Sequence, residues 1–253
     1  MELPGTPEYS LLEPNTVRIV LLGKTGSGKS SLANTVFGEN VFKVKHFLDS
    51  QANICQEKSG SINGRKLTVV ETPGFFSPGM SESELKSEIL KCVTECAPGP
   101  HVFLIVLKVE KFTEQEAHVI RQMHEYFSAE VFKYSAVVFT HGDQLSQNMN
   151  IEAFISNNEH LKDLVEKCGG RCHVVDNKYW KNDQKDEYRS NQFQVAQLLN
   201  TIDNMKEHGG CYSTEMLEEW RRQQRQPSLA SFLFQKQPQR GEQQQIPHLI
   251  QRT

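Results

Sequence analysis

The sequence VRIVLLGKTGSGKS occupies residues 17–30 and decides the fold of this 253-residue chain. Five of its first six residues are apolar, which is typical of a strand buried inside a parallel sheet. The run GKTGSGKS that follows fits the phosphate-binding P-loop, which requires a strand before it and a helix after it. We expect that helix over residues 30–37. The alternative, a glycine-rich turn that binds nothing, is disfavoured by this context.

In a P-loop, glycines let the backbone amides turn toward phosphate oxygens, and a lysine places a positive charge beside them. Lys29 stands at that lysine position, and the hydroxyl of Ser30 follows it as a candidate ligand for Mg2+. The nucleotide-binding residues predicted in this segment are Gly23, Lys24, Thr25, Gly26, Ser27, Gly28, Lys29, Ser30 and Ser31.

Strands and helices alternate along the rest of the chain. Apolar runs predict strands at residues 67–71, 102–107, 136–140 and 172–175, and helical patterns lie at residues 83–96, 113–127 and 151–167. Ser81 with Glu84, and Thr113 with Glu116, have the spacing of capping boxes at helix starts. This alternation predicts an α/β fold with a mostly parallel sheet between layers of helices.

The chain divides into three parts by composition. A closing helix over residues 189–206 completes one domain, which we place at residues 16–206. A polar, helix-prone extension follows at residues 207–226. Residues 227–253 are rich in glutamine with little apolar periodicity, which predicts a disordered tail.

Net charge and hydropathy limit the classes of partner that this chain is expected to bind. A formal net charge of -3 and a pI near 6.3 argue against nucleic acid and anionic membranes, which attract basic faces. No stretch approaches the roughly 20 apolar residues of a membrane-spanning helix, and the first residues lack a basic start and an apolar core. We therefore expect a cytoplasmic protein with free thiols. A zinc site at Cys168, Cys172 and His173 is the alternative, but no second ligand pair has finger spacing.

The residues Thr140, His141, Gly142 and Asp143 follow a predicted strand and are the candidate base-reading element. A carboxylate at Asp143 can accept from N1–H and the exocyclic amine of guanine, whereas adenine offers no such donor pair. His141 stands where lysine is usual in this motif and can stack on the base. The alternative for Asp143 is a helix N-cap.

Glu71, Thr72, Pro73 and Gly74 follow another predicted strand. In this pattern the Gly74 amide contacts the γ-phosphate, and the acid lies near Mg2+. Most such motifs carry aspartate where this chain has Glu71, so we expect the longer carboxylate to hold the metal through water. A plain Pro-Gly turn is the alternative.

Together with residues 98–101 and the run Lys111-Phe112-Thr113-Glu114, these motifs resemble the AIG1-type GTPases, the GTPases of immunity-associated proteins. The similarity covers roughly residues 16–205 and includes the family's distinctive box at residues 98–127. The resemblance implies a three-layer P-loop GTPase fold with a six-stranded sheet, and GTP-dependent dimers formed through the nucleotide faces. It also assigns Asn177 to the fifth guanine motif.

Two departures from the family bear on catalysis. Ala52 stands where relatives often place a switch threonine, and Lys111 stands where hydrolysing relatives can supply an arginine. Lysine provides charge without the bidentate fork of arginine, and an arginine finger contributes about 10³ to 10⁵ in rate. Lys111 is therefore the candidate catalytic residue of a slow enzyme, or simply an exposed loop charge.

The resulting prediction is a protein that binds GTP or GDP with Mg2+ and acts as a dimerising switch or scaffold, with slow hydrolysis at most. The competing hypothesis is a P-loop kinase or ATPase acting on a small substrate. Asp143 and the absence of a lid-like arginine cluster favour the first.

Overall fold

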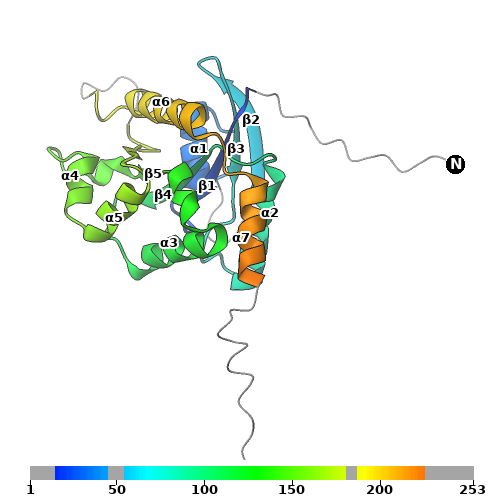
Figure 1. Ribbon diagram of the computed structural model, residues 1–253. Coiled ribbons are helices and arrows are strands. Elements are labelled where there is room, and N and C mark those ends of the chain that lie inside the picture. The colour runs from blue at the N-terminus through cyan, green and yellow to red at the C-terminus, as the bar shows by residue number, and fades with distance from the viewer. Residues whose placement is uncertain (1–14, 45–53, 181–186, 226–253) are drawn as a thin grey trace, which may run out of the picture.

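The computed structural model describes residues 15–44, 54–180 and 187–225 (Figure 1). Its centre is a six-stranded sheet in the order β2-β3-β1-β4-β5-β6. The strands are β1 (Val17–Leu22), β2 (Gln56–Ile62), β3 (Arg65–Glu71), β4 (Val102–Lys108), β5 (Ser135–Thr140) and β6 (Cys172–Val174). Only the β2–β3 pair is antiparallel within this sheet, and the other four pairs are parallel.

Helices cover both faces of the sheet (Figure 1). They are α1 (Lys29–Phe37), α2 (Glu82–Glu95), α3 (Glu114–Phe127), α4 (Ile151–Ser156), α5 (Glu159–Lys167), α6 (Asn191–Gly209) and α7 (Thr214–Arg225), with 3-10 helices η2 (Ala129–Tyr134) and η3 (Gly142–Gln144). Side chains of α1 and α6 pack in one core cluster, and side chains of α2, α3, α4, α5 and α7 pack in the other. The predicted three-layer α/β fold is confirmed.

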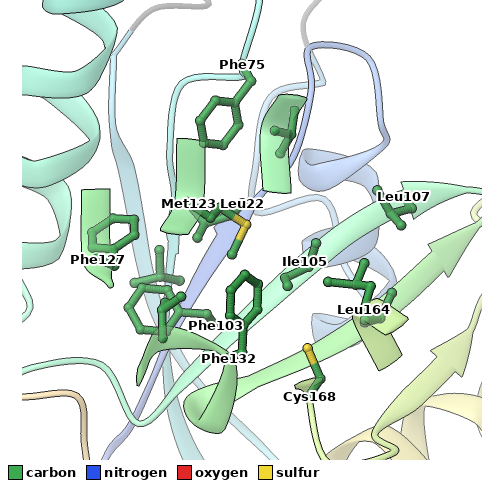
Figure 2. Packing of buried hydrophobic residues seen from close by; sticks show 14 of the residues in the cluster. Leu22, Phe75, Phe103, Ile105, Leu107, Met123, Phe127, Phe132, Leu164 and Cys168 are labelled. Atoms are coloured by element: carbon green, nitrogen blue, oxygen red, sulfur yellow. The ribbon is translucent and has the colours of Figure 1, made fainter. Parts of the chain in front are cut away.

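Strand β1 supplies both cores because successive side chains of a strand point to opposite faces. Ile19 and Leu21 belong to the cluster with α1 and α6, whereas Val20 and Leu22 belong to the other. Figure 2 shows Leu22 among Phe103, Ile105 and Met123 in that second cluster. Burial on both faces explains why the central strands read as continuous apolar runs.

Helix ends agree with the sequence in two places and differ in one. The capping boxes of Ser81 with Glu84 and of Thr113 with Glu116 are both present. The single helix predicted over residues 151–167 is wrong, because the chain breaks into α4 and α5. The break occurs where Asn158 caps α5 by accepting hydrogen bonds from two backbone N–H groups.

Strand β2 was not predicted from apolar runs, because its sequence QEKSGSI lies at the sheet edge and is mostly polar. A different signal marks it. Asn63 and Gly64 form the two-residue connection to β3, and both have positive φ, at 49° and 79°. Asn-Gly is the preferred sequence for this hairpin turn.

The segment after α6 returns to the core. Tyr212 and Leu217 are buried in the same cluster as α2 and α3, and the Tyr212 hydroxyl donates to the Phe127 carbonyl at 2.7 Å. A Cβ on Gly99 would lie 2.0 Å from the Tyr212 carbonyl oxygen, so this close packing requires glycine. The domain boundary at residue 206 stays a prediction, and the predicted tail at residues 227–253 lies outside the described residues. Among the described helices, none has the length and apolar character needed to cross a bilayer.

Candidate functional site

The predicted site residues follow the carboxyl ends of neighbouring strands. The P-loop follows β1, residues 72–75 follow β3, residues 141–145 follow β5 and residues 175–179 follow β6. Strands β1, β3, β5 and β6 all run in the same direction as β4. These four segments therefore lie together at the carboxyl ends of the strands. Open α/β sheets bind their ligands at the carboxyl ends of the strands.

Glycines shape the P-loop at two positions where the backbone has no room for a side chain. A Cβ on Gly23 would lie 2.5 Å from the carbonyl oxygen of Val106. Gly28 has a φ of 92°, and its Cβ would lie 3.2 Å from Nδ2 of Asn177. Gly28 therefore allows the loop to pass close to the segment after β6.

The side chain of Lys29 lies within the P-loop. Its Nζ donates to the carbonyl oxygens of Gly23 at 3.0 Å and Lys24 at 3.2 Å, and the residue is only 5% exposed. Burial lowers the pKa of Lys29 to about 8, while the charge of Glu71 acts in the opposite direction. Within the part of the chain that the structure describes, this ammonium group is held by neutral carbonyls without a directly bonded anion, and a phosphate would supply one.

Side-chain oxygens of Ser30 and Glu71, the two predicted metal-binding residues, lie close together. The Ser30 hydroxyl donates to Oε1 of Glu71 at 2.7 Å. Oε2 of Glu71 is buried and has no hydrogen-bond partner among the described residues. A hydroxyl beside a buried carboxylate suits Mg2+, which usually takes one or two protein oxygens together with phosphates and water. These residues fit the predicted metal.

The segment after β3 is fastened to the P-loop. The backbone N–H of Thr25 donates to the Phe75 carbonyl at 2.9 Å, and the N–H of Phe75 donates to the Gly23 carbonyl at 3.1 Å. A Cβ on Gly74 would lie 2.5 Å from Oγ1 of Thr25. Gly74 therefore lies against the P-loop, and its contact with a γ-phosphate stays a prediction.

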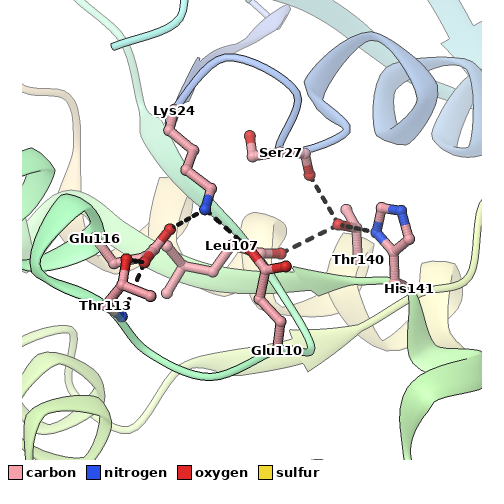
Figure 3. Close-up of polar contacts among 8 residues, drawn as sticks. All are labelled: Lys24, Ser27, Leu107, Glu110, Thr113, Glu116, Thr140 and His141. Carbon is pink, nitrogen blue, oxygen red and sulfur yellow. Dashed lines mark hydrogen bonds and ion pairs between the residues drawn. The ribbon is translucent and has the colours of Figure 1, made fainter. Parts of the chain in front are cut away.

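Thr140 joins the P-loop to the base-reading segment. Its buried hydroxyl lies 2.8 Å from the Ser27 carbonyl, 3.2 Å from the Leu107 carbonyl and 3.0 Å from Nδ1 of His141. Figure 3 shows these contacts beside the loop. His141 itself is exposed and has a left-handed backbone, with a φ of 60°.

Asp143 lies at a cavity of about 290 Å3 that is lined by residues 141, 143 and 144 after β5 and by residues 176–179 after β6. We call it the base-side cavity. Burial, together with a hydrogen bond to Asp176, raises the pKa of Asp143. Nε2 of Gln144 donates to Oδ2 of Asp143 at 2.6 Å. A carboxylate at the wall of this cavity can accept hydrogen bonds from a bound base.

Asn177 lies between this cavity and α1. Its Oδ1 accepts a hydrogen bond from the Thr35 hydroxyl at 2.9 Å. Its Nδ2 is buried without a partner among the described residues. Asn177 therefore offers a donor to a ligand near the P-loop.

Lys111 is exposed in the connection between β4 and α3. The next residue, Phe112, stacks on His160 with ring centroids 5.6 Å apart, and Thr113 caps α3. These flanking contacts anchor the segment that carries Lys111. Its catalytic role stays a prediction, and Ala52 lies outside the described residues.

Two acidic contacts of the P-loop were missed by sequence reasoning. Nζ of Lys24 lies 2.9 Å from Oε1 of Glu110 and 2.5 Å from Oε1 of Glu116 (Figure 3). Both carboxylates belong to the elements after β4. Nothing local in the sequence pairs them with Lys24, because the contacts depend on the order of strands in the sheet.

Asp176 is a third residue that sequence reasoning missed. It is buried at 2% exposure and touches both segments that line the base-side cavity. Its position directly before Asn177 and after an apolar strand was the available signal, since aspartate commonly organises turns there.

Comparison with known proteins identifies the family. The family model described as the AIG1 family matches residues 17–230. The chain is 32% identical over 197 residues to GTPase IMAP family member 8 of Homo sapiens, covering 78% of this chain and 29% of that protein. It is 33% identical over 217 residues to immune-associated nucleotide-binding protein 8 of Arabidopsis thaliana, covering 83% and 60%. The chain thus spans less than two thirds of either relative.

Solved structures share the fold. Toc33 from Arabidopsis thaliana in complex with Mg2+ and GMPPNP superposes with a TM-score of 0.61 at 21% identity, covering 77% of this chain and 86% of that one. A second structure, of a chloroplast translocon component for which dimerisation is important for GTPase activity, superposes with a TM-score of 0.60 at 23% identity, covering 77% and 84%. At these identities the likeness establishes the architecture alone.

Proposed function

Because the chain belongs to the AIG1 family, we propose that it binds GTP and GDP together with Mg2+ and acts as a nucleotide-controlled switch or scaffold that dimerises. Hydrolysis of GTP is slow in this proposal. The observation that carries this proposal is that three features lie together at the carboxyl ends of the strands. They are the buried ammonium group of Lys29, the paired side-chain oxygens of Ser30 and Glu71, and the base-side cavity.

Each group has a separate role in holding the nucleotide. Lys29 and the amides of the P-loop neutralise phosphate oxygens, and Ser30 and Glu71 hold Mg2+. When bound, Mg2+ would supply positive charge that neutralises the phosphates. In this proposal the Ser30 hydroxyl, which lies 2.7 Å from Oε1 of Glu71, would bind Mg2+ directly, and Glu71 would hold the metal through water.

The base is read on the other side of Thr140. Asp143 accepts from guanine N1–H and the amine, His141 stacks its exposed ring on the base, and Asn177 donates through Nδ2. A carboxylate that a bound base covers without pairing with it is costly, so such a site rejects ATP by up to about 10⁴-fold.

Dimerisation and slow hydrolysis rest on the loop after β4. Lys111 is exposed beside the P-loop contacts of Lys24, where a partner's nucleotide could be reached from this chain. The importance of dimerisation for a translocon GTPase of the same fold supports this proposal. Lysine at position 111 and alanine at position 52 both argue for slow turnover.

The test is a competition for the purified chain among GDP, GTP, a non-hydrolysable GTP analogue and ATP, with and without Mg2+. We expect guanine nucleotides to bind at least about 100-fold more tightly than ATP, and Mg2+ to strengthen triphosphate binding. Equal or tighter binding of ATP would instead support a P-loop kinase or ATPase. Sedimentation of the GDP and GTP-analogue complexes then tests the dimer.

A further inference from the structure

Two carboxylates meet at the base-side cavity. Asp143 follows β5 and Asp176 follows β6, and the backbone N–H of Asp143 donates to Oδ2 of Asp176 at 3.4 Å. The side chains lie close enough for each to shift the pKa of the other. Both residues line the same cavity of about 290 Å3.

The other oxygen of Asp176 is occupied by the turn that it begins. Oδ1 accepts from the backbone N–H groups of Lys178 at 2.9 Å, Tyr179, and Trp180 at 3.4 Å. Asn191 also fixes the Asp176 backbone, accepting from its N–H at 3.1 Å and donating to its carbonyl at 2.5 Å. Asp176 therefore sets the path of residues 176–180, including Asn177.

These contacts move the pKa values of the two carboxyl groups in opposite directions. Burial raises the pKa of Asp176, but the hydrogen bonds from Asp143 and from the turn outweigh it, and the pKa of Asp176 is lowered. Burial and the adjacent Asp176 raise the pKa of Asp143, against smaller opposing effects of Gln144 and His141. Lys178 also interacts with both carboxylates.

We propose that Asp176 is a positioning residue for guanine recognition, which fixes Asp143 relative to the Asn177 turn and opposes its negative charge. This inference rests on the proposed function. Guanine needs Asp143 as an ionised acceptor, so a protonated Asp143 cannot accept from both donors of the base. Guanine affinity consequently falls with decreasing pH, and it does so at a higher pH than for a lone aspartate.

The experiment measures GDP affinity from pH 7.5 to pH 4.5 for the wild-type chain, Asp176→Asn and Asp203→Asn. Asparagine keeps an acceptor oxygen for the 176–180 turn but removes the opposing charge. Asp203→Asn is the matched control, because it removes one carboxylate charge on α6, where Asp203 pairs with Arg65 at 2.6 Å. The nucleotide's own phosphates titrate alike in all three proteins.

We expect the pH at which affinity is half lost to move down in Asp176→Asn by on the order of one pH unit, and to stay unchanged in Asp203→Asn. Superimposable profiles for wild type and Asp176→Asn, with guanine preference intact, would overturn this inference alone. Failure of the wild-type chain to bind GDP would overturn the proposed function and this inference together.

If Asp176→Asn does not fold, the carboxyl 13C resonances of aspartate in the nucleotide-free wild-type chain replace it, with Asp143→Asn for assignment. Coupled, biphasic titration of Asp143 and Asp176 would support the inference. Independent single-step titrations would overturn it.

Discussion

The ammonium group of Lys24 in the P-loop lies 2.5 Å from the carboxylate of Glu116 in the first turn of α3. Glu116 simultaneously accepts hydrogen bonds from the backbone N–H and hydroxyl of Thr113 at the start of that helix. One buried carboxylate therefore joins the phosphate loop to the segment that carries Lys111.

This tie predicts a stability cost when one partner is removed. Partial burial disfavours the charged form of Lys24, but Glu116 and Glu110 still raise its pKa, and Lys24 and Thr113 lower the pKa of Glu116 despite burial. We expect Lys24→Met to lower the free energy of unfolding by about 2 kcal/mol at neutral pH. Because the folded pKa of Glu116 is depressed, this loss shrinks as pH falls through that pKa.

Urea unfolding of Lys24→Met, Glu116→Gln and the double variant measures the coupling. The control pair is Lys86 with Glu125, whose atoms lie 2.6 Å apart on the exposed surface and should contribute no more than about 1 kcal/mol. Equal coupling energies for the two pairs would contradict a special role for the Lys24 contact.

Lys29 predicts how nucleotide affinity changes with alkaline pH. Its pKa in the free protein is about 8, and a bound phosphate would raise it. GDP affinity should be flat below pH 8 and fall on the order of tenfold by pH 9, because binding must then recover a proton. Unfolded lysine keeps its proton to higher pH, so this group alone also makes the free protein more stable above pH 8.

Calorimetry at pH 8.5 in buffers of different ionisation enthalpy checks this, with proton uptake on GDP binding as the expected result. Guanosine serves as the control ligand, because it has no phosphate to restore the charge of Lys29. Proton uptake of the same size with guanosine would assign the effect to another group.

Ser30 predicts the metal dependence of binding. Ser30→Ala removes one oxygen of the pair with Glu71, so it should abolish most of the affinity that Mg2+ adds for GTP while affecting metal-free GDP binding less. Ser31→Ala is the matched control, since it removes the hydroxyl of the next residue and leaves the Ser30–Glu71 pair in place. Titrations in Mg2+ and in chelator measure both variants, and equal losses would exclude Ser30 as the ligand.

Lys111 predicts the limit on catalysis. Lys111→Arg should raise GTP turnover more than affinity if this loop reaches a partner's nucleotide, because guanidinium can bridge two phosphate oxygens. Ala52→Thr added to Lys111→Arg should raise turnover further. Lys91→Arg, at an exposed position of α2, should leave turnover unchanged. Turnover is measured against protein concentration. Rates per molecule that never rise with concentration would remove the dimer from the account.

The sequence predicted what local spacing determines. The P-loop, β1 and the two capping boxes all depend on residues within a few positions of one another, and the structure has them. Burial of parallel strands on both faces made the central apolar runs easy to recognise. The polar edge strand β2 was missed because apolar periodicity was absent there, although Asn63 and Gly64 marked its turn.

Contacts between segments that follow different strands could not be predicted from the sequence. Asp143 was predicted as the base reader, but its partner Asp176 follows the neighbouring strand, and strand order is needed to pair them. Lys24 was assigned to the phosphate loop by its motif, whereas its side-chain partners lie after β4. Such pairings depend on the folded topology and leave no periodic signal in the chain.

The most direct test of the central claim, guanine recognition by Asp143, compares GDP and xanthosine diphosphate binding to the wild-type chain, Asp143→Asn and Asp203→Asn. The side-chain amide that Asp143→Asn introduces can donate to the xanthine oxygen that replaces the guanine amine. We predict that Asp143→Asn weakens GDP binding by about 100-fold or more and binds xanthosine diphosphate more tightly than GDP, while Asp203→Asn keeps the wild-type preference. An unchanged base preference in Asp143→Asn would contradict the account.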